Sequence, residues 1–134
     1  VWRRFLPDVR RIIGVVDGRA IVVTDAGVLA VAMDTGATVW RTPLPELMVA
    51  QACAGPHGIM VSQSIPIEAG KKFRPQLVWL DPADGHIVNS APLPQFDDVE
   101  PRLGPLVIQS DRVWTWFGRG PHEPKRELVE LKSK

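Results

Sequence analysis

The sequence has few of the residues that build disulfides, membrane spans or strongly charged binding surfaces. It contains one cysteine, Cys53, which excludes an internal disulfide and leaves the cellular compartment undecided. No apolar run approaches the roughly 20 residues of a membrane-spanning helix, so we expect no membrane span. The 16 basic and 15 acidic residues give a net charge of +1, which offers no electrostatic basis for binding nucleic acid or an anionic membrane. With 45% hydrophobic and 23% charged residues, the 134-residue chain is typical of one globular domain.

Short apolar runs separated by tight turns dominate the first third of the chain. Residues 20–24 and 28–33 are rich in branched side chains, which fit a pleated strand better than a helix. Asp25–Gly27 follows the first run and Asp34–Gly36 the second, and glycine supplies the positive φ that a tight hairpin needs. The pattern predicts an antiparallel meander of four strands between residues 11 and 41.

Parts of this unit recur along the chain. Residues 39–45 (VWRTPLP) have a near copy at residues 1–7 (VWRRFLP), 38 positions earlier, and a weaker copy at residues 88–94. The segment 15–22 resembles residues 107–114. A repeat of roughly 40 to 50 residues with short strands is typical of four-stranded propeller blades. The sequence therefore predicts an all-β chain of about three propeller blades, with a β-sandwich of the same hairpins as the alternative.

A more specific pattern lies at residues 32–40 (AMDTGATVW). It consists of a small residue, Asp34, a short turn, Gly36, three further residues and Trp40. This pattern resembles the repeat of PQQ-like (quinoprotein-type) propellers. The resemblance implies that the tryptophan docks between neighbouring blades.

The second unit keeps Asp81 and Gly85, while Asn89 stands where the family has its tryptophan. When the turns are counted from their aspartates, the turn of the first unit is two residues shorter than that of the second. The third unit lacks the motif. The predicted docking motif comprises Asp34, Gly36, Trp40, Asp81 and Gly85.

We divide the chain into an outer strand at residues 1–7, a blade at 8–45, a second blade at 46–94 and an incomplete third blade at 95–134. Three blades are fewer than the four to eight of a closed propeller. We therefore expect a processed chain or a part of a longer polypeptide, or a homodimer that completes the ring. In the homodimer, residues 1–5 of each copy would complete the last blade of the other copy.

Two polar loops are the predicted partner-binding surface, because loops on a propeller face are where partners bind. The first is residues 65–75, in which basic side chains surround an aromatic one, and the second is residues 118–125. Composition favours the plainer alternatives, which are a solvated hairpin loop for residues 65–75 and an ion-paired surface for residues 118–125. An exposed groove across the blades is a further candidate for the binding surface. The candidate residues are Lys71, Lys72, Phe73, Arg74, Arg119 and His122.

No residue set predicts catalysis or metal binding. Cys53 and His57 have the spacing of two metal ligands, but a zinc site needs three or four. Asp97, Asp98 and Glu100 lack the alternating spacing and internal glycine of a calcium loop. We therefore expect no catalytic residue, no metal and no cofactor.

The quinoprotein resemblance implies a dehydrogenase that needs PQQ, a Ca²⁺ ion, a catalytic aspartate and often a vicinal cysteine pair. This chain has one cysteine and no residues that match the metal ligands. We therefore predict a non-catalytic interaction or scaffold module with a protein partner. The residues leave its location open, and the resemblance implies the bacterial periplasm or another site outside the cytoplasm. The alternatives are a fragment of such a dehydrogenase, or a ligand- or carbohydrate-sensing domain that uses Trp79, Trp114 and Trp116 as platforms.

Overall fold

The computed structural model describes the backbone of residues 1–44, 47–67, 72–92, 102–103, 107–109, 112–118 and 127–132, and the side chains of residues 1–44, 52–63 and 76–91. These residues form strands and turns, and none of them is helical. Within this part of the chain, no helix is long and apolar enough to cross a membrane. The prediction of an all-β fold is confirmed for the residues that the structure describes.

Two antiparallel four-stranded sheets follow one another along the chain, each with its strands in sequence order. The first sheet contains β1 (Val9–Val16), β2 (Arg19–Thr24), β3 (Gly27–Ala32) and β4 (Thr38–Pro43). The second sheet contains β5 (Leu47–Gly55), β6 (Gly58–Ile67), β7 (Lys72–Leu80) and β8 (Ile87–Pro92). The meander predicted from the branched apolar runs and glycine turns is therefore present in the first sheet.

A third sheet follows, with the order β10 (Val107–Gln109), β11 (Arg112–Gly118) and β12 (Glu127–Lys132). The short strand β9 (Arg102–Leu103) pairs with the end of β11, on the edge opposite β12. Together, β9 and β10 therefore line one edge of β11 in two pieces.

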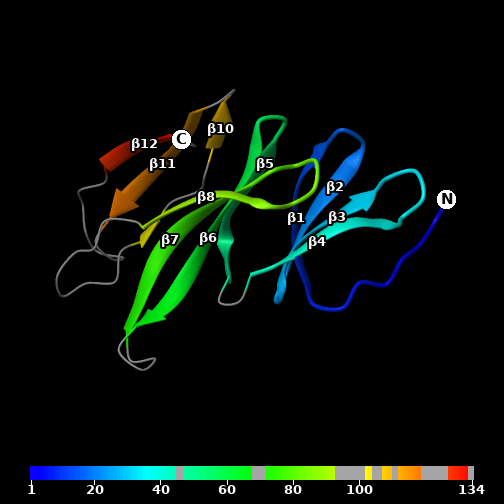
Figure 1. Ribbon diagram of the computed structural model, residues 1–134, viewed down its shortest axis with the longest axis horizontal. Coiled ribbons are helices and arrows are strands. Elements are labelled where there is room, and N and C mark those ends of the chain that lie inside the picture. Colours follow the sequence, from blue (N-terminus) through cyan, green and yellow to red (C-terminus); the bar gives the residue numbers. More distant parts are fainter. Residues whose placement is uncertain are drawn as a thin grey trace.

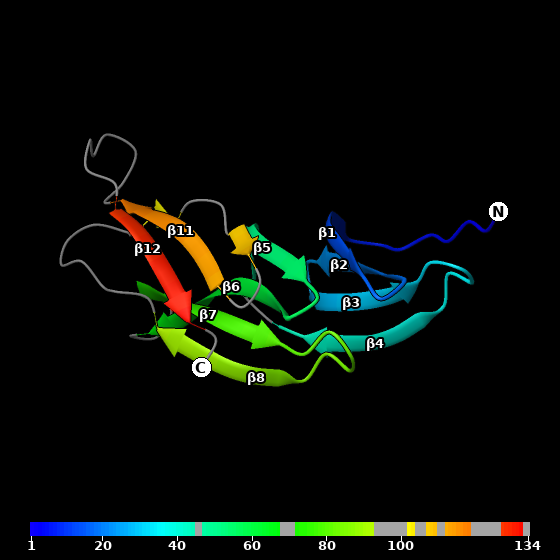
Figure 2. The same ribbon diagram turned by 90° about the horizontal axis from the view of Figure 1, so that it is seen from above.

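The three sheets stand side by side along the long axis of the molecule (Figure 1). β1 packs against β5, and β10 also lies beside β5, so β5 contacts both of the other sheets. β4 and β8 lie together along one edge of the array, as Figure 2 shows from above. The described residues form an open array and not a closed ring.

The main core lies between the first and second sheets. Its first-sheet side consists of Val16, Ile21, Val23, Val28, Ala30 and Trp40, with Leu44 after β4, and its second-sheet side consists of Ala52, Ile59, Val61, Val78 and Leu80. Gly14 in β1 lets the two sheets approach closely. A Cβ built at Gly14 would lie 3.2 Å from the Cβ of Ala54 in β5. The lack of a side chain at Gly14 therefore helps to set the separation of the sheets.

The other side of the first sheet, here called the outer face, carries a smaller apolar cluster. Val22, Leu29 and Val31 are buried there, and Leu6 and Ala20 pack against them. Ile12 is paired with Val22, and Val15 with Ala20, and directly paired residues share a face of a sheet. The outer face therefore consists of Ile12, Val15, Ala20, Val22, Leu29 and Val31.

Residues 1–6 differ from the expectation of an outer strand. They have no strand conformation, and no backbone hydrogen bond joins them to a strand among the described residues. A β-strand needs the N–H and C=O groups of a neighbouring strand, and no described strand is paired with this segment. Instead, side chains hold it against the first sheet.

Replacing Gly14 with valine should destabilise the packing of β1 on β5. A Cβ at this position already lies 3.2 Å from the Cβ of Ala54, and valine adds two methyl groups beyond it. Overpacking of this kind costs about 1–3 kcal/mol of unfolding free energy, which urea denaturation can measure. Adding Ala54→Gly should recover part of the loss, because it removes the facing methyl group. An equal cost of Gly14→Val with and without Ala54→Gly would show that the two positions do not meet.

Candidate functional site

The turn between β7 and β8 presents a row of backbone carbonyl groups to the first sheet. The Gly85 N–H donates to the Asp81 carbonyl at 2.7 Å, and the Asp81 N–H donates to the His86 carbonyl at 2.9 Å. The side chain of Asp81 accepts a further hydrogen bond, of 2.8 Å, from the N–H of Ala83. Gly85 has a φ of 75°, a conformation that strains residues with a Cβ.

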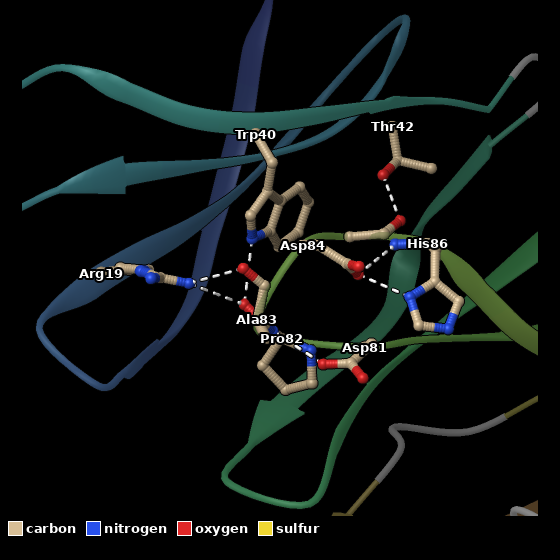
Figure 3. Close-up of polar contacts among 9 residues, drawn as sticks. Arg19, Trp40, Thr42, Asp81, Pro82, Ala83, Asp84 and His86 are labelled. Carbon is tan, nitrogen blue, oxygen red and sulfur yellow. Dashed lines mark hydrogen bonds and ion pairs between the residues drawn. The ribbon is translucent and has the colours of Figure 1, made fainter.

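Trp40 of β4 lies directly on this turn (Figure 3). Its indole N–H donates to the Pro82 carbonyl at 2.9 Å, and the Thr42 hydroxyl donates to the Gly85 carbonyl. A Cβ built at Gly85 would lie 2.6 Å from Cδ2 of the Trp40 ring, so a larger residue would displace the indole. Glycine is therefore required at position 85 for its backbone conformation and also for the space below the ring.

Arg19, at the start of β2, adds a third connection to the same turn. Its guanidinium group donates to the Ala83 carbonyl at 2.8 Å and to the Pro82 carbonyl at 3.3 Å (Figure 3). Sequence reasoning missed this role, because the partners are 63 and 64 residues apart and no local pattern joins them. Pro82 and Ala83 thus accept hydrogen bonds from two different strands of the first sheet.

The turn between β3 and β4 receives an equivalent contact from the N-terminal segment. The indole N–H of Trp2 donates to the Met33 carbonyl at 2.7 Å, and the Arg4 guanidinium donates to the Gly36 carbonyl at 2.8 Å. Gly36 has a φ of 74°, and a Cβ built on it would lie 2.6 Å from Cε3 of the Trp2 ring. The near copy of residues 39–45 at residues 1–7 therefore corresponds to a repeated three-dimensional contact.

The two turns have the same length, which corrects the expectation that the first is two residues shorter. The Gly36 N–H donates to the Ala32 carbonyl, as the Gly85 N–H donates to that of Asp81. Ala32 is thus the counterpart of Asp81, and Asp34 is an exposed residue inside the turn. Counting from the aspartates misled the prediction, because the glycine at positive φ closes each turn, whichever residue opens it.

In the last strand pair of the second sheet, the tryptophan lies on the third strand, whereas in the first sheet it lies on the fourth. Trp40 of β4 is paired with Ala30 of β3, whereas Asn89 of β8 is paired with Trp79 of β7. Trp79 is 5% exposed, and its indole nitrogen has no hydrogen-bond partner among the described residues. This burial removes Trp79 from the aromatic platforms of the sensing alternative, while the side chains of Trp114 and Trp116 lie outside the described residues.

A small polar cluster lies on the exposed side of the β7–β8 turn. Asp81, Asp84 and His86 each place one potential ligand atom within 4.8 Å of the others. The Asp84 carboxylate is 2.5 Å from Nδ1 of His86 and also accepts the backbone N–H of His86 at 3.0 Å. Sequence reasoning missed the cluster, although the acidic DPADGH stretch was a visible signal. The hydrogen bonds of the two carboxylates hold the turn in shape, which explains their position without an ion.

Cys53 lies in β5, and burial raises the pKa of its thiol to about 12. At neutral pH the thiol is therefore protonated, and a protonated thiol is a poor nucleophile and a poor metal ligand. His57 lies in the turn before β6 and is exposed. Neither residue belongs to the one potential ligand cluster found in the described part of the chain.

The predicted partner-binding loops are only partly described. Lys71, Arg119 and His122 lie outside the described residues. The loop expected at residues 65–75 is shorter than predicted, because β6 and β7 stay paired from Ile59 and Leu80 to Ile67 and Lys72. These strands contain prolines, and a proline can lie in a strand where its missing N–H is not needed.

Three of the predicted loop residues, Lys72, Phe73 and Arg74, lie in the first part of β7. Their backbone is described and their side chains are not. Asp97, Asp98 and Glu100 lie outside the described residues. The partner-binding role of the loops therefore stays a prediction.

Replacing Gly85 with alanine should destabilise the protein more than replacing Gly18 with alanine. Both glycines have similar φ values, 75° and 73°, so both substitutions carry a backbone cost of about 1–2 kcal/mol. A Cβ at Gly18 meets no atom within 4 Å, whereas a Cβ at Gly85 meets the Trp40 ring and adds an overpacking cost of about 1–3 kcal/mol. Urea denaturation of the two variants measures the difference directly. Equal losses would show that the indole does not rest on Gly85.

The Asp84–His86 pair should make the turn sensitive to pH. The hydrogen bond to Asp84 raises the pKa of His86 above 6.5, and the backbone N–H of His86, followed by its ring, lowers the pKa of Asp84 below 3.8. The stabilisation from His86 is complete below pH 6.5 and is lost as the pH rises through its raised pKa. The stabilisation from Asp84 is present above pH 3.8 and is lost as the pH falls through its lowered pKa. The pair therefore contributes most between about pH 4 and pH 6.5.

An NMR titration of the His86 ring checks this assignment. Asp84→Asn should lower the midpoint of the His86 titration, because the Asp84 hydrogen bond is the largest cause of its raised pKa. Asp81→Asn is the matched control and should lower it less, because Asp81 makes the smallest contribution. If both variants move the midpoint equally, the hydrogen bond to Asp84 is not its main cause.

No family model and no curated protein sequence matches this chain. The best-defined contacts around the first sheet are those of the two tryptophan rings, Trp2 and Trp40, on glycine-centred turns. The resemblance to PQQ-like propeller repeats stays a prediction.

Proposed function

We propose that this chain is a non-catalytic interaction module of the PQQ-like propeller type, and that it binds another protein through the outer face of the first sheet. The observation that supports this proposal is the exposure of apolar side chains on that face. Ile12 is 63% exposed and Val15 is 58% exposed, beside the buried cluster of Val22, Leu29 and Val31. Apolar side chains that gather on one face commonly mark a protein-binding surface.

The opposite side of the same sheet provides a reference for what such a face can bind. There, Ile21 and Val23 are fully buried against Ile59 and Val61 of the second sheet. Moving apolar surface from water into such a contact contributes about 25 cal/mol per Å². A protein surface of similar shape on the outer face would gain stability from Ile12 and Val15 in the same way.

Photo-crosslinking tests this function. We would introduce a benzophenone amino acid at Ile12 and, as a matched control, at Ile87, which is 51% exposed at the start of β8 and lies away from the outer face. In the cells that produce the protein, we expect the Ile12 variant to form a covalent adduct with a protein, because the probe lies within the proposed contact. The Ile87 variant should form much less.

Equal adduct formation at Ile12 and Ile87, or none at either position, would contradict the proposed interaction face. PQQ-dependent reduction of an electron-accepting dye by the purified chain with Ca²⁺ would instead support the dehydrogenase alternative. Mass spectrometry of the Ile12 adduct identifies the partner.

A further inference from the structure

We propose that the outer face is covered by the third sheet of a second copy of this chain, and that residues 1–5 of the first copy pair with β12 of the second as its fourth strand. This inference rests on the proposed function, because it names the partner of the interaction face. It is carried by the match between two contacts that the structure shows in full.

The first part of the match is the set of hydrogen bonds. Trp40 and Thr42 of the first sheet bond to the carbonyls of Pro82 and Gly85 in the second. Trp2 and Arg4 of the N-terminal segment bond to the carbonyls of Met33 and Gly36 in the first sheet. Trp2 and Trp40 are 38 residues apart, and so are Arg4 and Thr42. The carbonyl groups that accept their hydrogen bonds occupy equivalent positions in turns of equal length.

The second part of the match is apolar. Leu44 follows β4 and belongs to the core between the first and second sheets. Leu6 is its counterpart 38 residues earlier, and it packs against the Val22, Leu29 and Val31 cluster. Residues 1–6 therefore contact the first sheet in the same way as β4 and Leu44 contact the second sheet. They mark the position of the outermost strand of a sheet that covers the outer face.

The segment itself behaves as a strand without its sheet. Phe5 is strongly exposed, at 89%, and residues 1–6 form no strand pairing among the described residues. An extended segment with unpaired N–H and C=O groups readily pairs with a free strand edge. The covering sheet must therefore offer such an edge beside its third strand.

The third sheet offers this edge. Its pairs Gln109–Arg112 and Val107–Trp114 correspond to Val16–Arg19 and Gly14–Ile21 in the first sheet, so β10 and β11 correspond to β1 and β2. β12 then corresponds to β3, which is followed by β4 in the first sheet. Among the described residues, β12 is paired with β11 alone.

The correspondence also sets the register of the added strand. Arg41 is paired with Leu29 in the first sheet, and Leu29 is paired with Val22. In the third sheet Thr115 takes the place of Val22, and it is paired with Val129. Arg3, the counterpart of Arg41, should therefore lie opposite Val129 of the other copy.

The arrangement closes on itself. If the third sheet of one copy covers the outer face of the other, a two-fold axis repeats the same contact in the opposite direction. Two copies, each with the three sheets that the structure describes, bring six sheets into the proposed ring. This number lies within the four to eight blades of known propellers.

Disulfide formation between two single variants tests the register. Arg3→Cys and Val129→Cys chains would be mixed and oxidised at about pH 8, where thiolates form readily. Paired strands hold opposite Cα atoms about 4.5–5.5 Å apart, which lies within the range of a disulfide. We expect a covalent dimer in the mixture and none in either variant alone. Burial raises the pKa of the Cys53 thiol to about 12, so the native cysteine should not compete.

Light scattering gives an independent measurement on the unmodified chain. We expect a mass of twice 14.8 kDa, and we expect Trp2→Ala to return it to one chain mass while the urea midpoint of the sheets changes little. Ile87→Glu is the matched control and should leave the dimer intact, because Ile87 lies outside the proposed contact.

A single-chain mass at about 100 µM, a concentration that detects even weak dimers, together with no disulfide in the mixture, would overturn the second copy as partner. Dimers that persist in Trp2→Ala, or disulfides that form equally in the unmixed variants, would overturn it as well. An Ile12 adduct with a different protein would then leave the interaction function standing without the dimer. The absence of any specific Ile12 adduct, with a single-chain mass, would remove both proposals.

Discussion

An indole ring that rests on a glycine-centred turn is the contact on which the arrangement of the sheets depends. The turn holds Gly85 at a φ of 75°, and the Trp40 ring occupies the space that a Cβ would take. The lack of a side chain at Gly85 therefore permits both the backbone conformation of this turn in the second sheet and the packing of the Trp40 ring from the first sheet. The Pro82 carbonyl accepts the indole N–H, so the ring can be buried without the cost of an unpaired donor. This contact joins the edge of the first sheet to the second, while Gly14 sets the separation near β1 and β5.

The same contact at Gly36 shows that a short segment is sufficient to form it. Trp2, Arg4 and Leu6 reproduce the roles of Trp40, Thr42 and Leu44 although they belong to no strand. The segment covers only part of the outer face, and Ile12 and Val15 are left exposed to solvent. This exposed apolar surface is the part of the outer face on which the proposed function rests. The N-terminal segment leaves this surface uncovered, and we propose that a partner covers it.

The sequence predicted the all-β architecture and the meander because both depend on local signals. Branched residues in β2 and β3 favour strands, and Gly27 and Gly36 mark the turns that follow β2 and β3. It also predicted a docking motif that includes Gly36, Trp40 and Gly85. Asp34 was included because of its identity, yet the hydrogen bonds show Ala32 in the position of Asp81. Residue identity was a poorer guide there than the conformation of the glycine.

What the sequence by itself determined is the strand pattern, the glycine turns and the recurrence of a short segment 38 residues apart. These features are encoded by side chains that act on their own neighbours in the chain. Only the tertiary structure decided which turn each tryptophan contacts, that Arg19 joins the first sheet to Pro82 and Ala83, and that Trp79 is buried. These contacts join positions more than 40 residues apart or depend on how whole sheets pack, and no pattern within a strand or a turn specifies such partners.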